Sequence, residues 1–253
     1  MSKDNPISKD NPISKDNNKD IQFLEGPLSR WKEFTFLLDV FWDLWRGVRA
    51  LHFVGPCVTI FGSARFPPEH DYYKKAETIA AEISKLGFTI MTGGGPGIME
   101  AANKGAREVG GKSVGCNIIL ALEQTPNAYL DRFVNMDYFF TRKTMLIKYS
   151  YAFIVMPGGF GTLDELFEAL TLIQTGKLSS FPIVLFGTEF HKNLLEYIDD
   201  LISYGTLSPQ DKELIFITDS IDDTINFIRR HVLIKSNLRP YNAIRPIPWL
   251  MEK

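Results

Sequence analysis

Apolar runs alternate with amphipathic runs along most of this chain, and this alternation constrains the fold more than any other feature. The expected strands cover residues 57–62, 88–92, 113–120, 132–140, 151–156, 181–187 and 213–220. The expected helices cover residues 69–87, 98–110, 142–150, 162–176, 191–205 and 222–233. Strands that alternate with helices favour a parallel sheet with helices on both faces. We therefore predict an α/β fold with a doubly wound parallel sheet.

The N-terminal segment has a different character, because it is repetitive and polar. SKDNPI occurs at residues 2–7 and again at 8–13, and SKDN follows at 14–17. The repeat contains proline and has no apolar face that could be buried, so residues 1–20 are predicted to be a disordered repeat tail. The remaining residues, 21–253, are predicted to form a single domain.

Residues 28–54 are predicted to form an extra N-terminal helix. Apolar residues recur there at helical spacing: Phe34, Leu37, Leu38, Phe41, Leu44, Trp45, Val48 and Leu51. Asp39, Asp43 and Arg46 interrupt this run, which argues against a membrane span. The helix can pack on its own domain or on a sister subunit, and a helix lying on a membrane surface is a third interpretation. Because most of its circumference is apolar, we expect a homodimer or a higher homo-oligomer.

The overall composition excludes several function classes. The net charge is −2, so no basic excess indicates a nucleic-acid partner. Cys57 and Cys116 lie in apolar runs and are expected to be buried thiols, and the four histidines are scattered along the chain. These residues indicate neither a disulfide framework nor a metal site. No secretory signal opens the chain, so a cytoplasmic location is expected.

Two glycine-rich loops, GGGPG at 93–97 and PGGFG at 157–161, each follow an expected strand and precede an expected helix. Glycine lets backbone N–H groups approach an anion, and a helix N-terminus adds unpaired donors. Neither loop matches the dinucleotide pattern G-x-G-x-x-G. GKS at 111–113 resembles the end of a P-loop, but Ala106 stands where its first glycine is required. The loops are therefore phosphate-site candidates of another kind, or simply tight turns.

Charged residues lie next to the second loop. Glu165 lies one turn into the helix after the loop, and helical side chains point toward the N-terminus. A carboxylate there would repel a second anion, but it could bind ribose hydroxyls or stabilise positive charge at an anomeric carbon. Alternatively, it only favours the helix start. Arg142 and Lys143 are expected to open helix 142–150, where they suit a bound anion or a departing base, or form a solvated pair.

Three segments together resemble the Lonely Guy family, whose members are also labelled "lysine decarboxylase-like". They are GGGPGIMEAAN at 93–103, FFTRKTMLIKYS at 139–150 and PGGFGTLDE at 157–165. The likeness covers about 57–205, and the N-terminal helix resembles the longer bacterial branch. It implies a Rossmann-like fold, dimers or larger assemblies, and phosphoribohydrolase activity. Such enzymes cleave the N-glycosidic bond of a nucleoside 5′-monophosphate, such as AMP or a cytokinin riboside monophosphate, to free base and ribose 5-phosphate.

The resemblance also implies roles for particular residues. The 5′-phosphate would be held by Gly158, Gly159, Gly161, Thr162 and Ser63. Glu165 would face the ribose, and Arg142 would be its catalytic partner near the base. The remaining pocket would be shaped by Gly94, Gly95, Met99, Glu100 and Lys143. The first loop is one residue shorter than in plant-like members, so the preferred base stays open.

Neither a metal nor a cofactor is implied, since no ligand cluster and no Schiff-base lysine stands out. The alternative function is a non-catalytic regulator that binds a nucleotide through the same loops. A regulator would need the glycines but not the carboxylate. The presence of both Arg142 and Glu165 therefore favours the enzyme.

Overall fold

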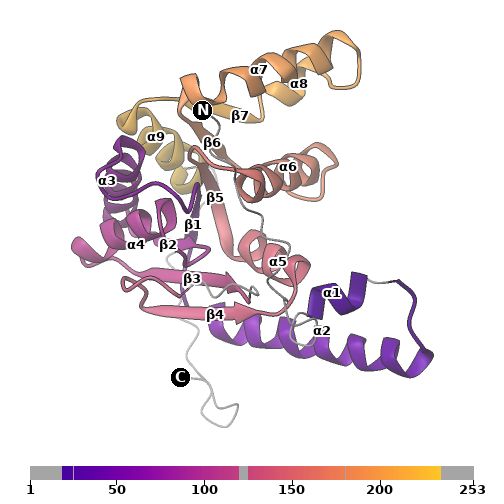
Figure 1. Cartoon of the computed structure of the whole chain (residues 1–253). Coiled ribbons are helices and arrows are strands. Elements are labelled where there is room, and N and C mark those ends of the chain that lie inside the picture. The colour runs from indigo at the N-terminus through magenta and orange to yellow at the C-terminus, as the bar shows by residue number, and fades with distance from the viewer. Residues whose placement is uncertain (1–18, 25, 120–124, 180, 235–253) are drawn as a thin grey trace, which may run out of the picture.

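The computed structural model describes residues 19–24, 26–119, 125–179 and 181–234, and its centre is a seven-stranded parallel sheet (Figure 1). The strands are β1 (Cys57–Phe61), β2 (Thr89–Thr92), β3 (Ser113–Ile118), β4 (Arg132–Met136), β5 (Ser150–Val155), β6 (Ile183–Phe186) and β7 (Ile215–Thr218). Their order in the sheet is β4-β3-β2-β1-β5-β6-β7, and every neighbouring pair is parallel.

Helices cover both faces of this sheet. One face is covered by α3 (Asp71–Lys85), α4 (Ile98–Glu108) and α9 (Ile221–Ile228). The other is covered by α5 (Phe139–Tyr149), α6 (Phe160–Gln174), α7 (Thr188–Ser203) and the C-terminal end of α2 (Arg30–Leu51). Along β1, Val58 and Ile60 join the first core, whereas Cys57 and Phe61 join the second. Burial on both faces explains why the strands are continuous apolar runs. The predicted doubly wound fold is confirmed.

The strand order reverses between β1 and β5, and the loops that follow these two strands are therefore neighbours (Figure 1). The amide of Ser63 donates to the carbonyl of Pro157 at 2.9 Å and ties the two loops together. The loop after β2 packs against the loop after β1 at Gly97. Gly97 has φ +68°, and an added Cβ there would stand 2.4 Å from the Ser63 carbonyl oxygen. Ligands of doubly wound proteins bind at such a switch point.

The N-terminal region differs from the prediction at its boundaries. Residues 1–18 of the predicted tail lie outside the described residues, but α1 (Lys19–Leu24) includes the last two residues of that tail. Lys19 Nζ lies 3.0 Å from Asp137 Oδ2, and Asp20 accepts a hydrogen bond from the amide of Phe139 at 3.3 Å. These partners are more than a hundred residues away in the sequence, so local composition does not reveal them.

Helix α5 begins earlier than the predicted helix 142–150, and β4 ends earlier than the predicted strand 132–140. Asp43 of α2 explains the difference. Its carboxylate accepts hydrogen bonds from the amides of Asp137 and Tyr138, at 3.1 and 3.4 Å. The acceptor satisfies N–H groups at the start of α5 and so stabilises the helix start at Phe139.

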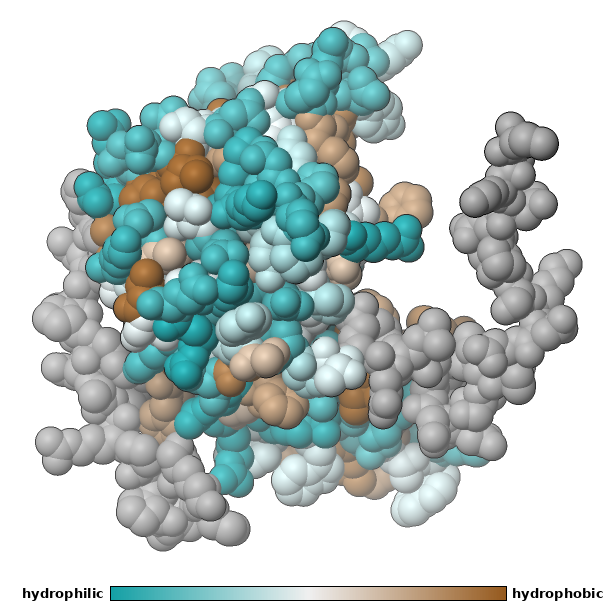
Figure 2. Space-filling model, turned by 60° about the vertical axis from the view of Figure 1, so that its left-hand side comes forward, coloured by the Kyte–Doolittle hydropathy of each residue, from teal (hydrophilic) through white to brown (hydrophobic). Residues whose placement is uncertain are grey.

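One face of α2 is exposed and apolar. Its inner face packs on β4 and α5 through Asp43, Gly47 and Leu51. Its outer face exposes Trp31, Phe34, Leu37, Leu38, Phe41, Trp42 and Trp45. In contrast, the face turned forward in Figure 2 is largely hydrophilic, with apolar side chains in small separate groups. Among the described helices, none is long and apolar enough to cross a membrane.

Candidate active site

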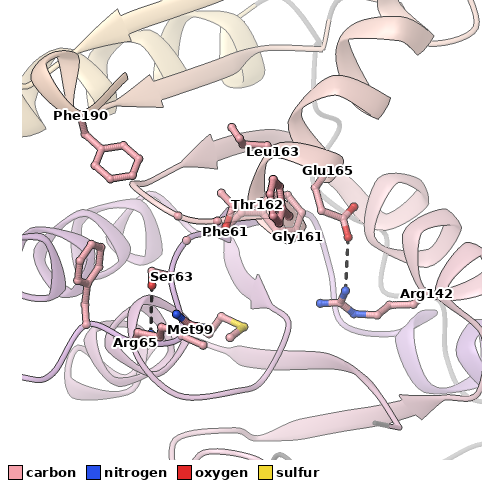
Figure 3. A pocket seen from close by; sticks show the side chains of 16 residues that line it. Phe61, Ser63, Arg65, Met99, Arg142, Gly161, Thr162, Leu163, Glu165 and Phe190 are labelled. Carbon is pink, nitrogen blue, oxygen red and sulfur yellow. Dashed lines mark hydrogen bonds and ion pairs between the residues drawn. The ribbon is translucent and has the colours of Figure 1, made fainter. Parts of the chain in front are cut away.

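A cavity of about 800 Å³ opens at the switch point of the sheet (Figure 3). Its walls come from the loop after β1, the loop after β5 with the start of α6, and single side chains of α4, α5 and α7. The predicted site residues that line it are Ser63, Met99, Arg142, Gly158, Gly159, Gly161, Thr162 and Glu165. Gly94, Gly95, Glu100 and Lys143 do not line it.

The loop between β5 and α6 presents backbone to the cavity. An added Cβ at Gly159 or Gly161 would meet nothing within 4 Å, so both glycines face open space. At Gly158 an added Cβ would stand 2.1 Å from Thr162 Oγ1, so glycine there lets Thr162 fold back against the loop. The first turn of α6 has amide groups without helical partners and carries the positive end of the helix dipole. This loop can bind an anion.

Arg142 and Glu165 meet at one side of the cavity. Arg142 Nη1 lies 3.4 Å from Glu165 Oε1 (Figure 3). Arg142 Nε donates to the carbonyl of Cys116 at 2.9 Å. Glu165 is only 3% exposed, and its Oε2 has no hydrogen-bond partner among the described residues. The site therefore holds a buried carboxylate with one oxygen unpaired, which can receive a bond from a ligand.

Burial changes the acidity of this carboxyl. Desolvation raises the pKa of Glu165 to about 7, and the nearby Arg142 guanidinium opposes the shift without cancelling it. A carboxyl with a pKa near neutrality can accept and release a proton at physiological pH. Strong shifts of this kind, in a cleft and beside a specific charge partner, are typical of functional sites.

Some residues near the cavity had no predicted role. Arg65, the last residue of the FGSAR motif, lines the cavity. Its amide donates to Ser63 Oγ at 3.1 Å. Phe66 and Phe190 line it as well, and no sequence pattern indicates either. Gly93 is needed because an added Cβ would stand 2.6 Å from the Arg142 guanidinium. Gly93 belongs to the GGG run, but the family resemblance implied a role only for Gly94 and Gly95.

The other two glycines of the first loop support the fold around the cavity. The amide of Gly94, at φ +76°, donates to Thr92 Oγ1 at 2.9 Å. The carbonyl of Gly95 accepts from Asn127 Nδ2 at 3.0 Å. Both glycines therefore stabilise the loop through backbone hydrogen bonds, and neither lines the cavity.

The two remaining predicted residues are engaged elsewhere. Glu100 Oε1 accepts from the Tyr73 hydroxyl at 3.2 Å and so joins α4 to α3. Lys143 Nζ lies 3.0 Å from Asp164 Oδ1 and 3.1 Å from Glu168 Oε2. It joins α5 to α6 on either side of Glu165, which makes it a neighbour of the cavity and not part of its wall.

Metal ligands do not gather in the part of the chain that the structure describes, where no group of three or more His, Cys, Asp or Glu side chains could hold an ion. Cys57 and Cys116 are free and buried, as predicted.

Comparison with known proteins shows which family the chain belongs to. The family model described as "Possible lysine decarboxylase" matches residues 99–228, about half of the chain. The chain belongs to this family. The match includes the start of α4, α5 and the loop before α6, and it confirms the family indicated by the three sequence motifs.

Two curated bacterial relatives carry the same name. A protein of Mycobacterium tuberculosis, named cytokinin riboside 5′-monophosphate phosphoribohydrolase, is 32% identical over 165 residues, covering 64% of this chain and 88% of the relative. A protein of Rhodococcoides fascians with the same name is 27% identical over 175 residues, covering 68% and 88%.

Solved structures show the same fold. The molybdenum cofactor carrier protein of Chlamydomonas reinhardtii matches with a TM-score of 0.52 and 21% identity, covering 70% of this chain and 98% of that chain. The molybdenum cofactor binding protein of Rippkaea orientalis matches with a TM-score of 0.50 and 23% identity, covering 73% and 98%. At this identity the likeness supports the Rossmann-like fold alone.

Proposed function

We propose that this protein is a phosphoribohydrolase, which cleaves the N-glycosidic bond of a nucleoside 5′-monophosphate to free base and ribose 5-phosphate. The observation that carries the proposal is the pairing of a partly buried Arg142 with the buried Glu165 beside a glycine loop at a helix start, all lining one cavity. The shared name of the curated relatives supports the same reaction. AMP and cytokinin riboside monophosphates are the proposed substrates.

Substrate binding would begin at the phosphate. The loop at Gly158–Gly161 and the first turn of α6 would receive the 5′-phosphate, with Thr162 closing the loop. Ser63 and the Arg65 guanidinium approach from the facing loop, and a guanidinium can neutralise part of the phosphate charge. Binding energy from the phosphate would then hold the ribose and the scissile bond near Glu165.

The reaction would use both Arg142 and Glu165. As the bond between C1′ and the base nitrogen breaks, its electron pair goes to the base and positive charge develops on the ribose. The Glu165 carboxylate would stabilise that charge and accept a proton from the water that attacks C1′. Arg142 would donate a hydrogen bond to the base as it departs with the electron pair. The base nitrogen then takes up a proton from solvent, and Glu165 returns to solvent the proton it accepted, so that one water molecule in total is divided between ribose and base.

The printed family description suggests a different chemistry, which the cavity does not support. A pyridoxal phosphate decarboxylase needs a lysine that forms a Schiff base with the cofactor. Among the described residues no lysine lines the cavity, and Lys143, which lies nearby, is paired with two carboxylates. The residues present therefore do not fit that cofactor.

A nucleotide-binding regulator is the alternative function. The burial of Glu165 favours the enzyme, because a receptor for phosphate gains nothing from a desolvated carboxylate close to the anion. A carboxylate of this kind is useful where positive charge appears during a reaction.

The reaction is tested by incubating the protein with AMP and separating the products by chromatography. We expect adenine and ribose 5-phosphate, and a kcat/KM for adenosine that is lower by roughly 10²-fold or more, because two or more charge-assisted hydrogen bonds to the phosphate are lost. Equal turnover of adenosine and AMP would contradict a phosphate-anchored substrate. AMP binding without release of adenine would favour the regulator.

We propose further that a second copy of the chain covers the outer face of α2. The exposed apolar side chains of that face offer an area on the order of 800 Å², taking about 200 Å² for a fully exposed aromatic side chain. A stable dimer typically buries about 800 Å² per partner. Self-association through two α2 helices would remove this surface from water.

A charge at the centre of this face is expected to weaken self-association. Leu38, 44% exposed, lies midway along the face, and Leu38→Glu should shift light-scattering mass toward the monomer at micromolar concentration. Tyr204→Glu is the matched control, because Tyr204 is 82% exposed at the end of α7, far from α2 in the sequence and outside its contacts. A parent protein that is monomeric at this concentration would contradict the proposal.

A further inference from the structure

Asp43 is a buried carboxylate on α2 for which the proposed reaction has no direct use. It is 2% exposed and gathers four donor groups from two elements. The donors are the Arg46 guanidinium, the amides of Asp137 and Tyr138, and the Thr141 hydroxyl. These donors satisfy the hydrogen-bonding capacity of a carboxylate that is removed from water.

Three of these donors belong to the start of α5. The N-cap residue of α5, Tyr138, makes no side-chain capping bond of its own. Asp43 therefore satisfies the N-cap amide of α5 from another helix, while Asp20 satisfies the amide of Phe139, and the negative charge of Asp43 complements the positive end of the α5 dipole. One turn beyond Asp43, Gly47 lies against Met145 so closely that an added Cβ would stand 2.8 Å from the Met145 side chain. Helix α2 thus fixes α5 at two points.

Thr141, whose hydroxyl lies within hydrogen-bond distance of both Asp43 Oδ2 and the Tyr138 carbonyl, directly precedes Arg142. Because Arg142 lies in the first turn of α5, the position of that turn sets where its guanidinium, 3.4 Å from Glu165, can reach. We propose that Asp43, through Thr141, is a positioning residue that holds Arg142 against Glu165, so that the N-terminal helix is part of the active-site scaffold. This inference rests on the proposed function.

The residues proposed to position Arg142 are separate from those proposed to bind the phosphate. The phosphate loop belongs to β5 and α6, and neither Asp43 nor Thr141 lines the cavity. Loss of the Asp43–Thr141 bond would let the start of α5 shift while the loop stays in place. A displacement of about 1 Å at a catalytic group can reduce the rate on the order of 10²-fold.

The experiment compares Thr141→Val, which removes the hydroxyl, with Thr141→Ser, which keeps it. We expect Thr141→Val to lower kcat for AMP on the order of 10- to 100-fold, with the Kd for ribose 5-phosphate, measured by calorimetry, within about twofold of the parent. Thr141→Ser should retain kcat. The matched control is Thr224→Val, because Thr224 is also a buried threonine in the first turn of a helix, with its hydroxyl bonded to Ser220, and it lies outside the cavity.

A second readout does not depend on catalysis. The charged groups around Glu165 are Arg142 and Lys143 on α5, with Asp164 and Glu168 on α6. Because Arg142 lowers the pKa of Glu165, its displacement in Thr141→Val should raise that pKa, measured by carbon-13 NMR of the Glu165 carboxyl carbon. Thr224→Val should leave it unchanged. A parent protein that releases no adenine would refute the proposed function, and the NMR titration would still test the positioning.

Two results would overturn the inference. One is equal kcat and equal Glu165 pKa in Thr141→Val and Thr141→Ser. The other is a loss of kcat in Thr141→Val that is matched by an equal loss in Thr224→Val, since this would trace the effect to general destabilisation.

Discussion

Replacement of Glu165 by glutamine is expected to lower kcat for AMP by roughly 10²- to 10³-fold, the usual cost of removing a preorganised electrostatic group. Glutamine is nearly isosteric and can still accept a hydrogen bond from the ribose. Its neutral amide neither stabilises positive charge at C1′ nor accepts a proton from water. Nucleotide binding should be unchanged or tighter, because repulsion between the carboxylate and the phosphate is removed. Release of adenine and calorimetric binding of AMP measure the two effects.

The same substitution should change how stability depends on pH. The folded-state pKa of Glu165, about 7, lies above the ordinary value of 4.5, so the folded protein binds this proton more tightly than the unfolded chain does. The cost of ionising the buried carboxyl is therefore absent below pH 4.5 and complete above pH 7. Glu165→Gln should have a higher Tm than the parent at pH 8, with the difference fading toward pH 4.5.

Glu196→Gln is the control for both measurements, because Glu196 is exposed on α7 and lies outside the cavity. It should match the parent in rate and in the pH dependence of Tm. Parent-like turnover of AMP by Glu165→Gln would show that the carboxylate only favours the helix start.

The local signals in the sequence predicted the sheet and one wall of the cavity. Continuous apolar runs identify strands that are buried on both faces, and the strand–glycine–helix order places a loop at the carboxyl edge of the sheet. For the same reason Glu165 could be placed relative to Gly161, since both lie on one short segment whose geometry is set by helical spacing.

Contacts between distant segments explain what the sequence did not predict. The start of α5 at Phe139 depends on Asp43, which lies on another helix. Glu100 faces Tyr73 on α3 and not the cavity. Phe190 enters the cavity wall from α7 because β6 lies next to β5 in the sheet. No spacing rule within one segment contains this information.

Removal of the Arg142 side chain tests the other half of the pair. Arg142→Ala is expected to reduce kcat/KM for AMP on the order of 10²-fold, because the departing base loses a donor and Glu165 loses its nearest cation. Arg142→Lys should recover only part of the rate, since an ammonium group lacks the fork that bonds the Cys116 carbonyl and the carboxylate together. A rate for Arg142→Ala equal to that of the parent would exclude a role for Arg142 in base departure.

The pH profile of Arg142→Ala should reveal the coupling between the two side chains. If ionised Glu165 is the active form, kcat/KM of the parent rises with pH and levels off above about pH 7, the pKa of this carboxyl. The Arg142 guanidinium lowers that pKa, so its removal must shift the rise to higher pH, and the deficit of the variant should be larger at pH 6.5 than at pH 9. Lys143→Ala is the control, because Lys143 also lowers the pKa of Glu165 but by less than Arg142 does, so its removal should shift the rise by less. A deficit that is the same at every pH would show that Arg142 does not set the ionisation of Glu165, and the two residues would then act independently.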